Sequence, residues 1–561
     1  MLHGRAFALL ALLTCPLFAQ QSSPSSAETI EVSIINVDVV VTDRKGNRVY
    51  GLTHDDFAIR ENGAPQAITN FAEYAPQTKR ADGAVTVDTN SAAAPEAVAA
   101  PASKRTIVIF IDLVPHASER AREVFASLRE FIRKAVRPGD SATVVLFATR
   151  LATQQTFTDD TEALASALTA IEERSIGVAL GRGETIDRGV ASDDALEASL
   201  ATASHPIGGE LVSIGEFERK AAEMDELMEL RRKAAALTSL MESMSGIEGK
   251  KIMVAALDRF GLRLGTPAST EPIKPDALVE RLRQKVMRSA NANGVTLYPI
   301  HVPGLEIRNW PSVLSAPGTG MTSDFEVDLV RFAINDTSLM NQTASFFEIA
   351  EATGGLMAAG PSDIVELLPH IVEDLESYYS LAYRATPTGV DGARKVRVTT
   401  KNPDYEVRSR QAVIEKSDDT QMNDRVVSNL FQAVEYSVVP ITAKLGQITR
   451  KGKLWSLPVS VRIPIGALTT SSGSETATGA FSVFIASGSE FGVISDITRR
   501  SQPYSIRNTE LESARESHFT YDVTVDVDGR ASVLSIGVRD EVSKEFGMVR
   551  IPLPVQYEVR Q

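Results

Sequence analysis

RTIVIFIDL, residues 105 to 113, is the stretch that decides the fold expected for this chain. It is a continuous apolar run, as in a strand that is buried on both faces of a parallel sheet, and it ends at the carboxylate of Asp112. A helix is expected to follow from Ser118. In an open α/β sheet, ligands bind beyond the carboxyl ends of the strands. Asp112 is therefore the first candidate for contact with a ligand.

Strand and helix patterns alternate from residue 105 to residue 413. Further strands are expected at residues 142–147, at 251–257 directly before Asp258, and at 295–302. Such alternation is typical of a Rossmann-like α/β domain, with a mostly parallel sheet and helices on both faces. Two insertions are expected to interrupt this domain, at residues 175–215 and 304–341. Three short strands, at 378–383, 395–400 and 407–413, are expected to complete it.

Strand patterns also flank the α/β domain on both sides. Residues 28–74 are expected to form a small N-terminal β module, which needs a neighbour to cover its apolar face. Residues 75–104 have no periodicity and are expected to be a flexible linker. After a charged break at 415–425, strict alternation predicts a C-terminal β-sandwich over residues 426–557. The chain is therefore expected to be a multidomain protein.

Length and charge limit the classes of partner. A chain of 561 residues is expected to contain about three or four domains. Its formal net charge of -14 disfavours binding to nucleic acid or to an anionic membrane surface. We expect the partner to be a protein or a cell-surface ligand. The oligomeric state is left open.

The N-terminus is typical of an exported protein. Arg5 precedes an apolar run and a plausible cleavage site ends at Ala19, so residues 1–19 are expected to be a signal peptide. No transmembrane segment is expected after cleavage. The mature protein is expected in the periplasm or outside the cell. Cys15 is the only cysteine and lies inside this signal, and a lipoprotein attached through Cys15 is the alternative.

Four stretches carry a resemblance to a known family. They are RTIVIFIDL, VVVTDRKGNRVYGLTHDDFAIRENGAPQAITNF at 39–71, KIMVAAL at 251–257, and DLESYYSLAYRA at 374–385. They resemble the von Willebrand factor A (vWA) domain, and the layout is similar to that of bacterial VWFA-related domain proteins. The resemblance covers roughly residues 31–413 and is weaker in the C-terminal β region. It implies a vWA domain that recognises a protein or surface ligand.

The resemblance also implies a metal-ion-dependent adhesion site, usually for magnesium. Its first motif, D-x-S-x-S, corresponds to Asp112, Val114 and His116, so neither serine position holds a hydroxyl. Asp258 matches a later aspartate of the family, and Thr185 is a guess for its threonine. Because imidazole prefers softer metals than Mg²⁺, we expect a degenerate site. Its candidate metal ligands are Asp112, Asp258 and His116, and Mg²⁺ is the candidate cofactor.

Simpler interpretations of these residues stay open. Asp112 could belong to the cap of the following helix, and His116 could be a solvated loop histidine. None of the seven histidines lies in an H-E-x-x-H motif or beside a G-x-S-x-G elbow. We therefore expect a non-enzymatic, exported binding protein. The alternatives are a structural cell-envelope scaffold without metal dependence, and a hydrolase whose triad is assembled across loops.

Overall fold

The computed structural model describes most of the strands and helices expected from the sequence. The described residues are 33–75, 105–113, 119–148, 151–179, 214–258, 260, 277–302, 344–358, 361–385, 391–432, 437–452, 454–489, 494–529 and 531–553. The expected signal peptide at 1–19 with Cys15, nearly all of the linker at 75–104, and most of the insertions at 175–215 and 304–341 lie outside these residues.

The central sheet has the strand order β7-β6-β5-β8-β9. Its strands are β5 (Arg105–Asp112), β6 (Ser141–Phe147), β7 (Leu151–Thr158), β8 (Lys250–Leu257) and β9 (Val295–His301). β5 pairs in parallel with β6 and β8, β8 pairs in parallel with β9, and β7 runs antiparallel to β6. The expectation of a mostly parallel sheet is confirmed. Edge strand β7 was missed because its half-exposed, polar sequence lacks a continuous apolar run.

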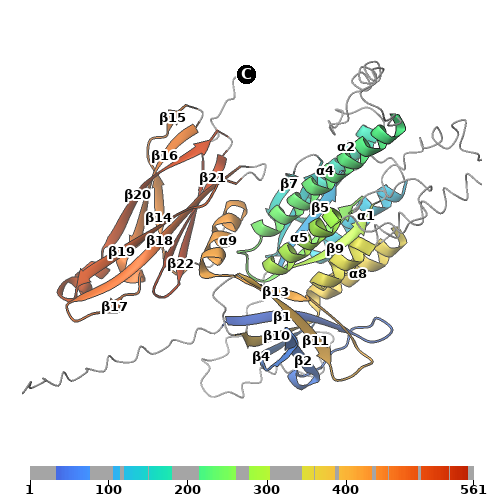
Figure 1. Ribbon diagram of the computed structural model, residues 1–561, viewed down its shortest axis with the longest axis horizontal. Helices are drawn as coiled ribbons and strands as arrows, with labels where there is room; N and C mark the ends of the chain where they lie inside the picture. The colour runs from blue at the N-terminus through green and yellow to red at the C-terminus, as the bar shows by residue number, and fades with distance from the viewer. Residues whose placement is uncertain are drawn as a thin grey trace, which may run out of the picture.

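Helices cover both faces of this sheet (Figure 1). On one face lie α1 (Glu119–Ala135), α2 (Thr161–Ala179) and α8 (Pro361–Glu376), and on the other α4 (Ile214–Ser243), α5 (Ala277–Asn293) and a helix at 344–353. Successive strand residues point to opposite faces, so Ile107 and Ile109 belong to the first core while Val108 and Phe110 belong to the second. The expected α/β arrangement is confirmed.

The N-terminal strands do not form a module of their own. They are β1 (Ser33–Thr42), β2 (Phe57–Glu61), β3 (Ala64–Gln66) and β4 (Ile68–Tyr74), and they share two sheets with β10 (Tyr378–Ala385), β11 (Gly392–Thr400), β12 (Glu406–Ser409) and β13 (Ala412–Glu415). One sheet has the order β12-β1-β10-β4 and the other β13-β11-β2-β3. The two sheets share one core, which includes Val37, Ile59, Leu381 and Val396. We call this unit the flanking β module.

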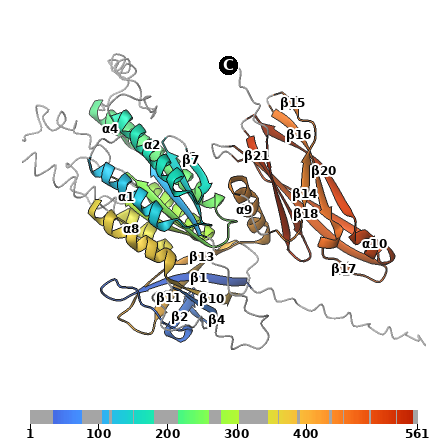
Figure 2. The same ribbon diagram turned by 180° about the vertical axis from the view of Figure 1, so that it is seen from behind.

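This pairing corrects the expectation that the three strands from residue 378 to residue 413 complete the α/β domain, because they pair with the N-terminal strands instead. The valines of β1 that alternate with polar residues need an apolar surface opposite them, and β10 and β11 supply it. The α/β domain is therefore inserted between β4 and β10. Figure 2 shows the blue N-terminal strands beside the brown strands that follow the central domain.

The C-terminal region is mostly strands. One antiparallel sheet contains β14 (Thr442–Leu445), β15 (Thr449–Lys451), β16 (Leu454–Pro464) and β20 (His518–Asp528), and the other contains β17 (Ser471–Ser472), β18 (Thr476–Ser489), β19 (Thr498–Arg507), β21 (Ala531–Asp540) and β22 (Phe546–Pro552). The two sheets share one core, in which Leu457 and Val461 meet Phe481 and Ile536.

Short helical turns occur at both ends of the chain. One lies near the N-terminus at η1 (His54–Asp56), and three lie in the C-terminal region at η3 (Ile465–Ala467), η4 (Asn508–Glu510) and α10 (Leu511–Arg515).

The charged segment after residue 415 is a helix rather than a break. Helix α9 spans Asp418–Phe431, and the Ser417 hydroxyl caps it by accepting a hydrogen bond from the Thr420 N–H group. Met422 and Val426 on its apolar face pack against Phe484 of the C-terminal sheet. The helix lies between the central domain and the C-terminal sheets in both views (Figures 1 and 2).

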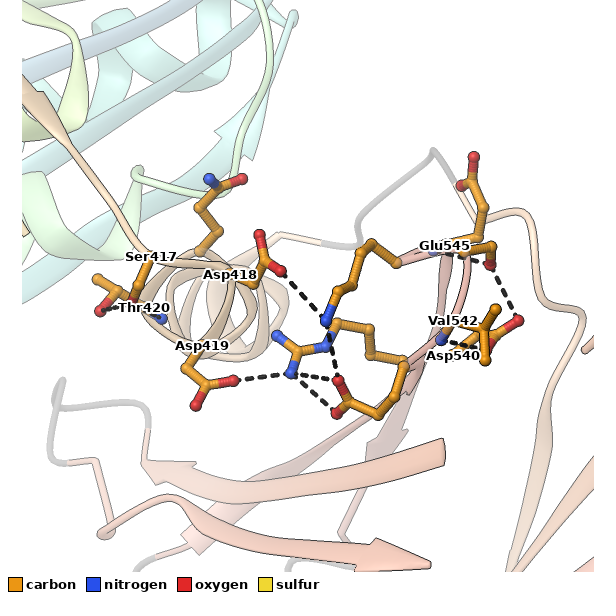
Figure 3. Close-up of polar contacts among 12 residues, drawn as sticks. Ser417, Asp418, Asp419, Thr420, Asp540, Val542 and Glu545 are labelled. Atoms are coloured by element: carbon orange, nitrogen blue, oxygen red, sulfur yellow. Dashed lines mark hydrogen bonds and ion pairs between the residues drawn. The ribbon is translucent and has the colours of Figure 1, made fainter. Parts of the chain in front are cut away.

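Ion pairs attach the start of α9 to the C-terminal strands. Arg539 of β21 donates to Asp419 at 2.7 Å, and Lys544 lies 3.4 Å from Asp418. Figure 3 shows these two aspartates facing the turn that contains Val542. On the opposite side of α9, the Ser428 hydroxyl accepts a hydrogen bond from the Gly246 N–H group of the central domain at 2.9 Å. The helix therefore contacts both regions.

A buried ionic cluster joins the flanking β module to the central domain. Asp374 of α8 accepts hydrogen bonds from Arg408 of β12, at 2.9 and 3.1 Å, and from the Tyr298 hydroxyl at 2.7 Å. Arg48 also pairs with this carboxylate, and Lys250 donates to the Asp374 carbonyl.

Among the described residues, no helix is both long and apolar enough to cross a membrane.

Candidate binding site at the carboxyl edge of the central sheet

The structure brings Asp112 and Asp258 to the same edge of the central sheet. Asp112 is the last residue of β5, and Asp258 directly follows β8. These strands are parallel neighbours with Ile111 opposite Ala256, so their carboxyl ends meet. The Asp258 N–H group faces the Asp112 carboxylate, with 3.4 Å between nitrogen and Oδ2. This edge is where an α/β sheet binds its ligands.

A lysine that sequence reasoning missed completes this site. The Lys233 ammonium of α4 lies 2.5 Å from Asp112 Oδ2, and the two side chains are only 2% and 5% exposed. Glu229 lies one helical turn earlier, with its Oε1 atom 3.9 Å from the same ammonium. The site therefore contains a buried ion pair between a strand end and a helix, with further carboxylates near it.

The spacing along α4 contains a signal for Lys233. Leu230 and Leu237 are buried residues of the apolar face of this helix. Lys233 stands three residues after the first and four before the second, so it must lie on the same face. A lysine in that position needs an anionic partner in the core. The apolar spacing alone does not show which acid Lys233 meets.

The Asp112 carboxyl is only partly balanced by its cation. Burial raises the pKa of Asp112, and attraction to Lys233 opposes this rise without cancelling it. The negative charges of Asp258 and Glu229 raise the pKa further. Among the described residues, the carboxylates of Asp112, Asp258 and Glu229 thus meet the ammonium of Lys233 at this edge.

The described residues do not fit a magnesium ion at this edge. Mg²⁺ requires oxygen ligands in near-octahedral geometry at about 2.0–2.1 Å. The ammonium of Lys233 already contacts one oxygen of Asp112, and a metal there would meet a buried like charge. Within the described ranges, no group of three or more His, Cys, Asp or Glu residues could hold a metal. His116 and Thr185 lie outside those ranges.

No protein-family model and no curated protein matches this chain. Solved structures that are similar to it include an aerotolerance-related membrane protein from Bacteroides fragilis, with 13% identity, 47% of this chain and 98% of that chain covered, and a TM-score of 0.21. The vWF domain of the type V pili tip protein Mfa5 from Porphyromonas gingivalis has 12% identity, covers 48% and 94%, and has a TM-score of 0.21.

A third similar structure is the manganese-loaded TRAP protein from Plasmodium vivax. It has 10% identity to this chain, 55% of this chain and 93% of that chain are covered, and the TM-score is 0.23. These scores are low, so the description of the site rests on the sheet order and contacts of this chain.

Proposed function

We propose that this chain is an exported, non-enzymatic binding protein whose central domain recognises a protein or cell-surface ligand without a divalent cation. The observation that carries the proposal is the Lys233 ammonium, 2.5 Å from Asp112 Oδ2. The vWA resemblance implies a metal beside this aspartate. In this proposal the Lys233 side chain supplies the positive charge in place of the metal, which makes the adhesion site a degenerate one.

The remaining acidic groups indicate the chemistry of the partner. Asp258 is half-buried at the rim of the edge, and the Glu229 side chain is 29% exposed. Among the residues that the structure describes at this edge, these two together with Asp112 and Lys233 make three carboxylates and one ammonium. Complementary charge sets partner choice and the rate of encounter, so a lysine or arginine of the partner fits this edge. The net charge of -14 also favours a positively charged partner.

Calorimetric titration of the mature chain with Mg²⁺ and Mn²⁺ tests the metal-independent part. We expect no saturable heat from the wild-type chain. Saturable heat that Asp112→Asn removes, and that the surface variant Asp404→Asn retains, would show a working metal site and overturn the proposal.

Recognition is tested by capture of cell-envelope proteins on the immobilised mature chain. Binding to the captured partner should be the same in EDTA and in Mg²⁺. Asp258→Asn should weaken it about tenfold, because a charged contact at the rim is lost. Asp522→Asn changes an exposed aspartate of β20 and is the matched control. Binding that EDTA abolishes would contradict the proposal.

Export is tested by N-terminal sequencing of the protein from the cells that make it. We expect a mature chain that begins at Gln20. A chain that retains residues 1–19 in the cytoplasm would contradict export. A mature chain that begins at a lipidated Cys15 would indicate the lipoprotein alternative.

A structural cell-envelope scaffold is the second candidate function. The Asp374 cluster favours it, because this cluster fixes the flanking β module against the central domain through buried ion pairs. A scaffold of this kind needs no recognition edge. Captured proteins that are unaffected by Asp258→Asn but lost with Asp374→Asn would favour the scaffold over the binding protein.

A further inference from the structure

A polar cavity lies at the end of the central sheet opposite Asp112. Its volume is about 260 Å³, and it is lined by residues of three regions. The central domain contributes Lys251 and Asn291, and the turn between β12 and β13 contributes Arg410. Lys416 lies just before α9, and Arg425 lies in the middle of this helix. We call it the junction cavity.

Two cations in the junction cavity donate to carbonyl groups. Lys251 is 8% exposed and donates to the carbonyls of Ile247, at 2.8 Å, and Ser245, at 3.5 Å. Arg410 donates to the Gly294 carbonyl at 3.5 Å. In the part of the chain that the structure describes, neither Lys251 nor Arg410 has a carboxylate within ion-pair distance.

A buried amide beside these cations has unused hydrogen-bonding capacity. Asn291 is 6% exposed, and within the described residues its side-chain oxygen has no hydrogen-bond partner. Buried polar atoms normally have partners, so this atom indicates a missing one. Rotation of the amide by half a turn presents its NH₂ group in the same place.

The other charges of the cavity do not cancel these cations. Lys416 is already paired with Asp424 at 2.5 Å, and Arg425 lies 4.2 Å from the centre of the Phe546 ring. Glu248 is the remaining acidic residue of the lining. Among the described lining residues, four cationic side chains thus face two carboxylates, and Asp38 of β1 adds an attraction to Arg410 from outside the lining.

We propose that the junction cavity binds a small oxyanion of the class of inorganic phosphate or sulfate. Lys251 is buried and Arg410 is half-buried, and among the described residues neither is in an ion pair. An oxyanion would satisfy several of their donors at once. Arg410 can present two parallel N–H groups to it, while Lys251 contributes a point charge. The volume lies just below the roughly 300 to 1,000 Å³ of pockets for larger ligands. A free anion therefore fits better than a nucleotide.

The lining ties this site to the arrangement of the three regions. Lys251 belongs to β8, Arg410 belongs to the flanking β module, and Lys416 precedes Ser417, the N-cap of α9. Because α9 is fastened to the C-terminal strands through Asp418 and Asp419 (Figure 3), an anion between these cations would stabilise all three junctions together. The site is independent of the carboxyl edge, so either proposal can fail alone.

Protonation of Lys251 should be linked to anion binding. Burial and the positive charges of Arg410 and Lys416 lower the pKa of Lys251 to about 7. The negative charges of Asp424 and Glu248 act in the opposite direction but are weaker. A bound anion favours the ammonium form and raises the pKa. Sulfate keeps its charge over the neutral range, so it should bind more tightly near about pH 6 than near about pH 9.

Calorimetry and thermal unfolding of the full mature chain test this site, with phosphate and sulfate as probes and chloride at matched ionic strength as the reference. We expect one saturable site and a rise in melting temperature with either oxyanion. Lys251→Met and Arg410→Met should each weaken sulfate binding about tenfold or more, because a charge-assisted hydrogen bond is lost. Lys444→Met changes an exposed lysine of β14 and is the matched control.

Two results would overturn the anion site. The first is a response to sulfate equal to the response to chloride in the wild-type chain, which needs no variant. The second is equal sulfate affinity of the wild-type, Lys251→Met and Arg410→Met chains. Because Lys251→Met removes a buried charge and keeps the length of the side chain, it should fold. If it does not, the milder Arg410→Gln variant decides.

Discussion

Asp112 and Asp374 are both buried carboxylates, but they face different numbers of cations. Within the described part of the chain, Asp112, at the carboxyl end of β5, pairs with one ammonium, that of Lys233. Asp374, on α8, meets the guanidinium groups of Arg48 and Arg408. Burial raises the pKa of Asp112 despite its cation, whereas for Asp374 burial is outweighed by the two arginines and the pKa is lowered.

The difference shows that a buried carboxylate can either hold two regions together or remain available to a ligand, depending on how many cations contact it. Two guanidinium groups and a tyrosine hydroxyl satisfy the oxygens of the Asp374 carboxylate, and these contacts fix two regions together. One ammonium leaves Asp112 and its neighbours with an excess of acid. A carboxylate whose charge is only partly offset is suited to recognition, whereas one that is held by several donors is suited to structure.

Asp374→Asn should have the largest effect on stability. It leaves Arg48 and Arg408 buried without their counter-charge, which should lower the free energy of unfolding by about 3–5 kcal/mol. Urea denaturation of the mature chain measures this. Asp404→Asn removes the partner of Arg44 in a pair that is 60% and 74% exposed, and should cost at most about 1 kcal/mol. Equal losses of stability in Asp374→Asn and Asp404→Asn would show that the buried cluster contributes no more than an exposed ion pair.

Lys233→Met should destabilise the chain less, by about 1–3 kcal/mol. Asp112 can respond by taking up a proton, since its pKa is already raised. The double variant Asp112→Leu with Lys233→Met removes both charges and should lie within about 1 kcal/mol of the wild type. A double variant that is less stable than either single variant would contradict this account.

The two carboxylates should respond to acid with opposite signs. The folded pKa of Asp374 lies below its unfolded value of 3.8, so its stabilisation is present above pH 3.8 and is lost as the pH falls through the folded pKa. The folded pKa of Asp112 lies above 3.8, so its contribution to the free energy of unfolding increases as the pH falls through that pKa.

Denaturation curves across the acid range, for the wild type and for Asp374→Asn and Asp112→Asn, measure these contributions. Asp374→Asn should reduce the loss of stability in acid, and Asp112→Asn should increase it. Each change should be about 1.4 kcal/mol for every tenfold difference in proton affinity between the folded and unfolded chains. Changes of the same sign in both variants would show that the number of facing cations does not determine the pKa.

Glu229→Gln should have the smallest effect and sharpens the comparison at the carboxyl edge. Its side chain is 29% exposed and lies 3.9 Å from Lys233, so the free energy of unfolding should change by at most about 0.5 kcal/mol. Because the Glu229 charge raises the pKa of Asp112, its removal should lower that pKa, which NMR titration of the carboxyl carbon measures. An unchanged or higher pKa would contradict the acidic excess at this edge.

The sequence by itself determined the local elements. The apolar run of β5 and the alternation in β16 each predict the structure found, because burial imposes a period on the residues of each element. It also placed Asp112 and Asp258 at one edge, since parallel strands end together. Edge strand β7 was missed, and the charged start of α9 concealed a helix that is stabilised by packing.

Only the tertiary structure decided which elements share a core and which charges meet. The alternation in β10 and β11 predicts an apolar face but cannot name its partner, which is the N-terminal strands more than 300 residues away along the chain. Lys233 pairs with Asp112, and Arg410 lies near Lys251, for the same reason. Pairing between distant residues depends on how whole faces pack, and no local period records it.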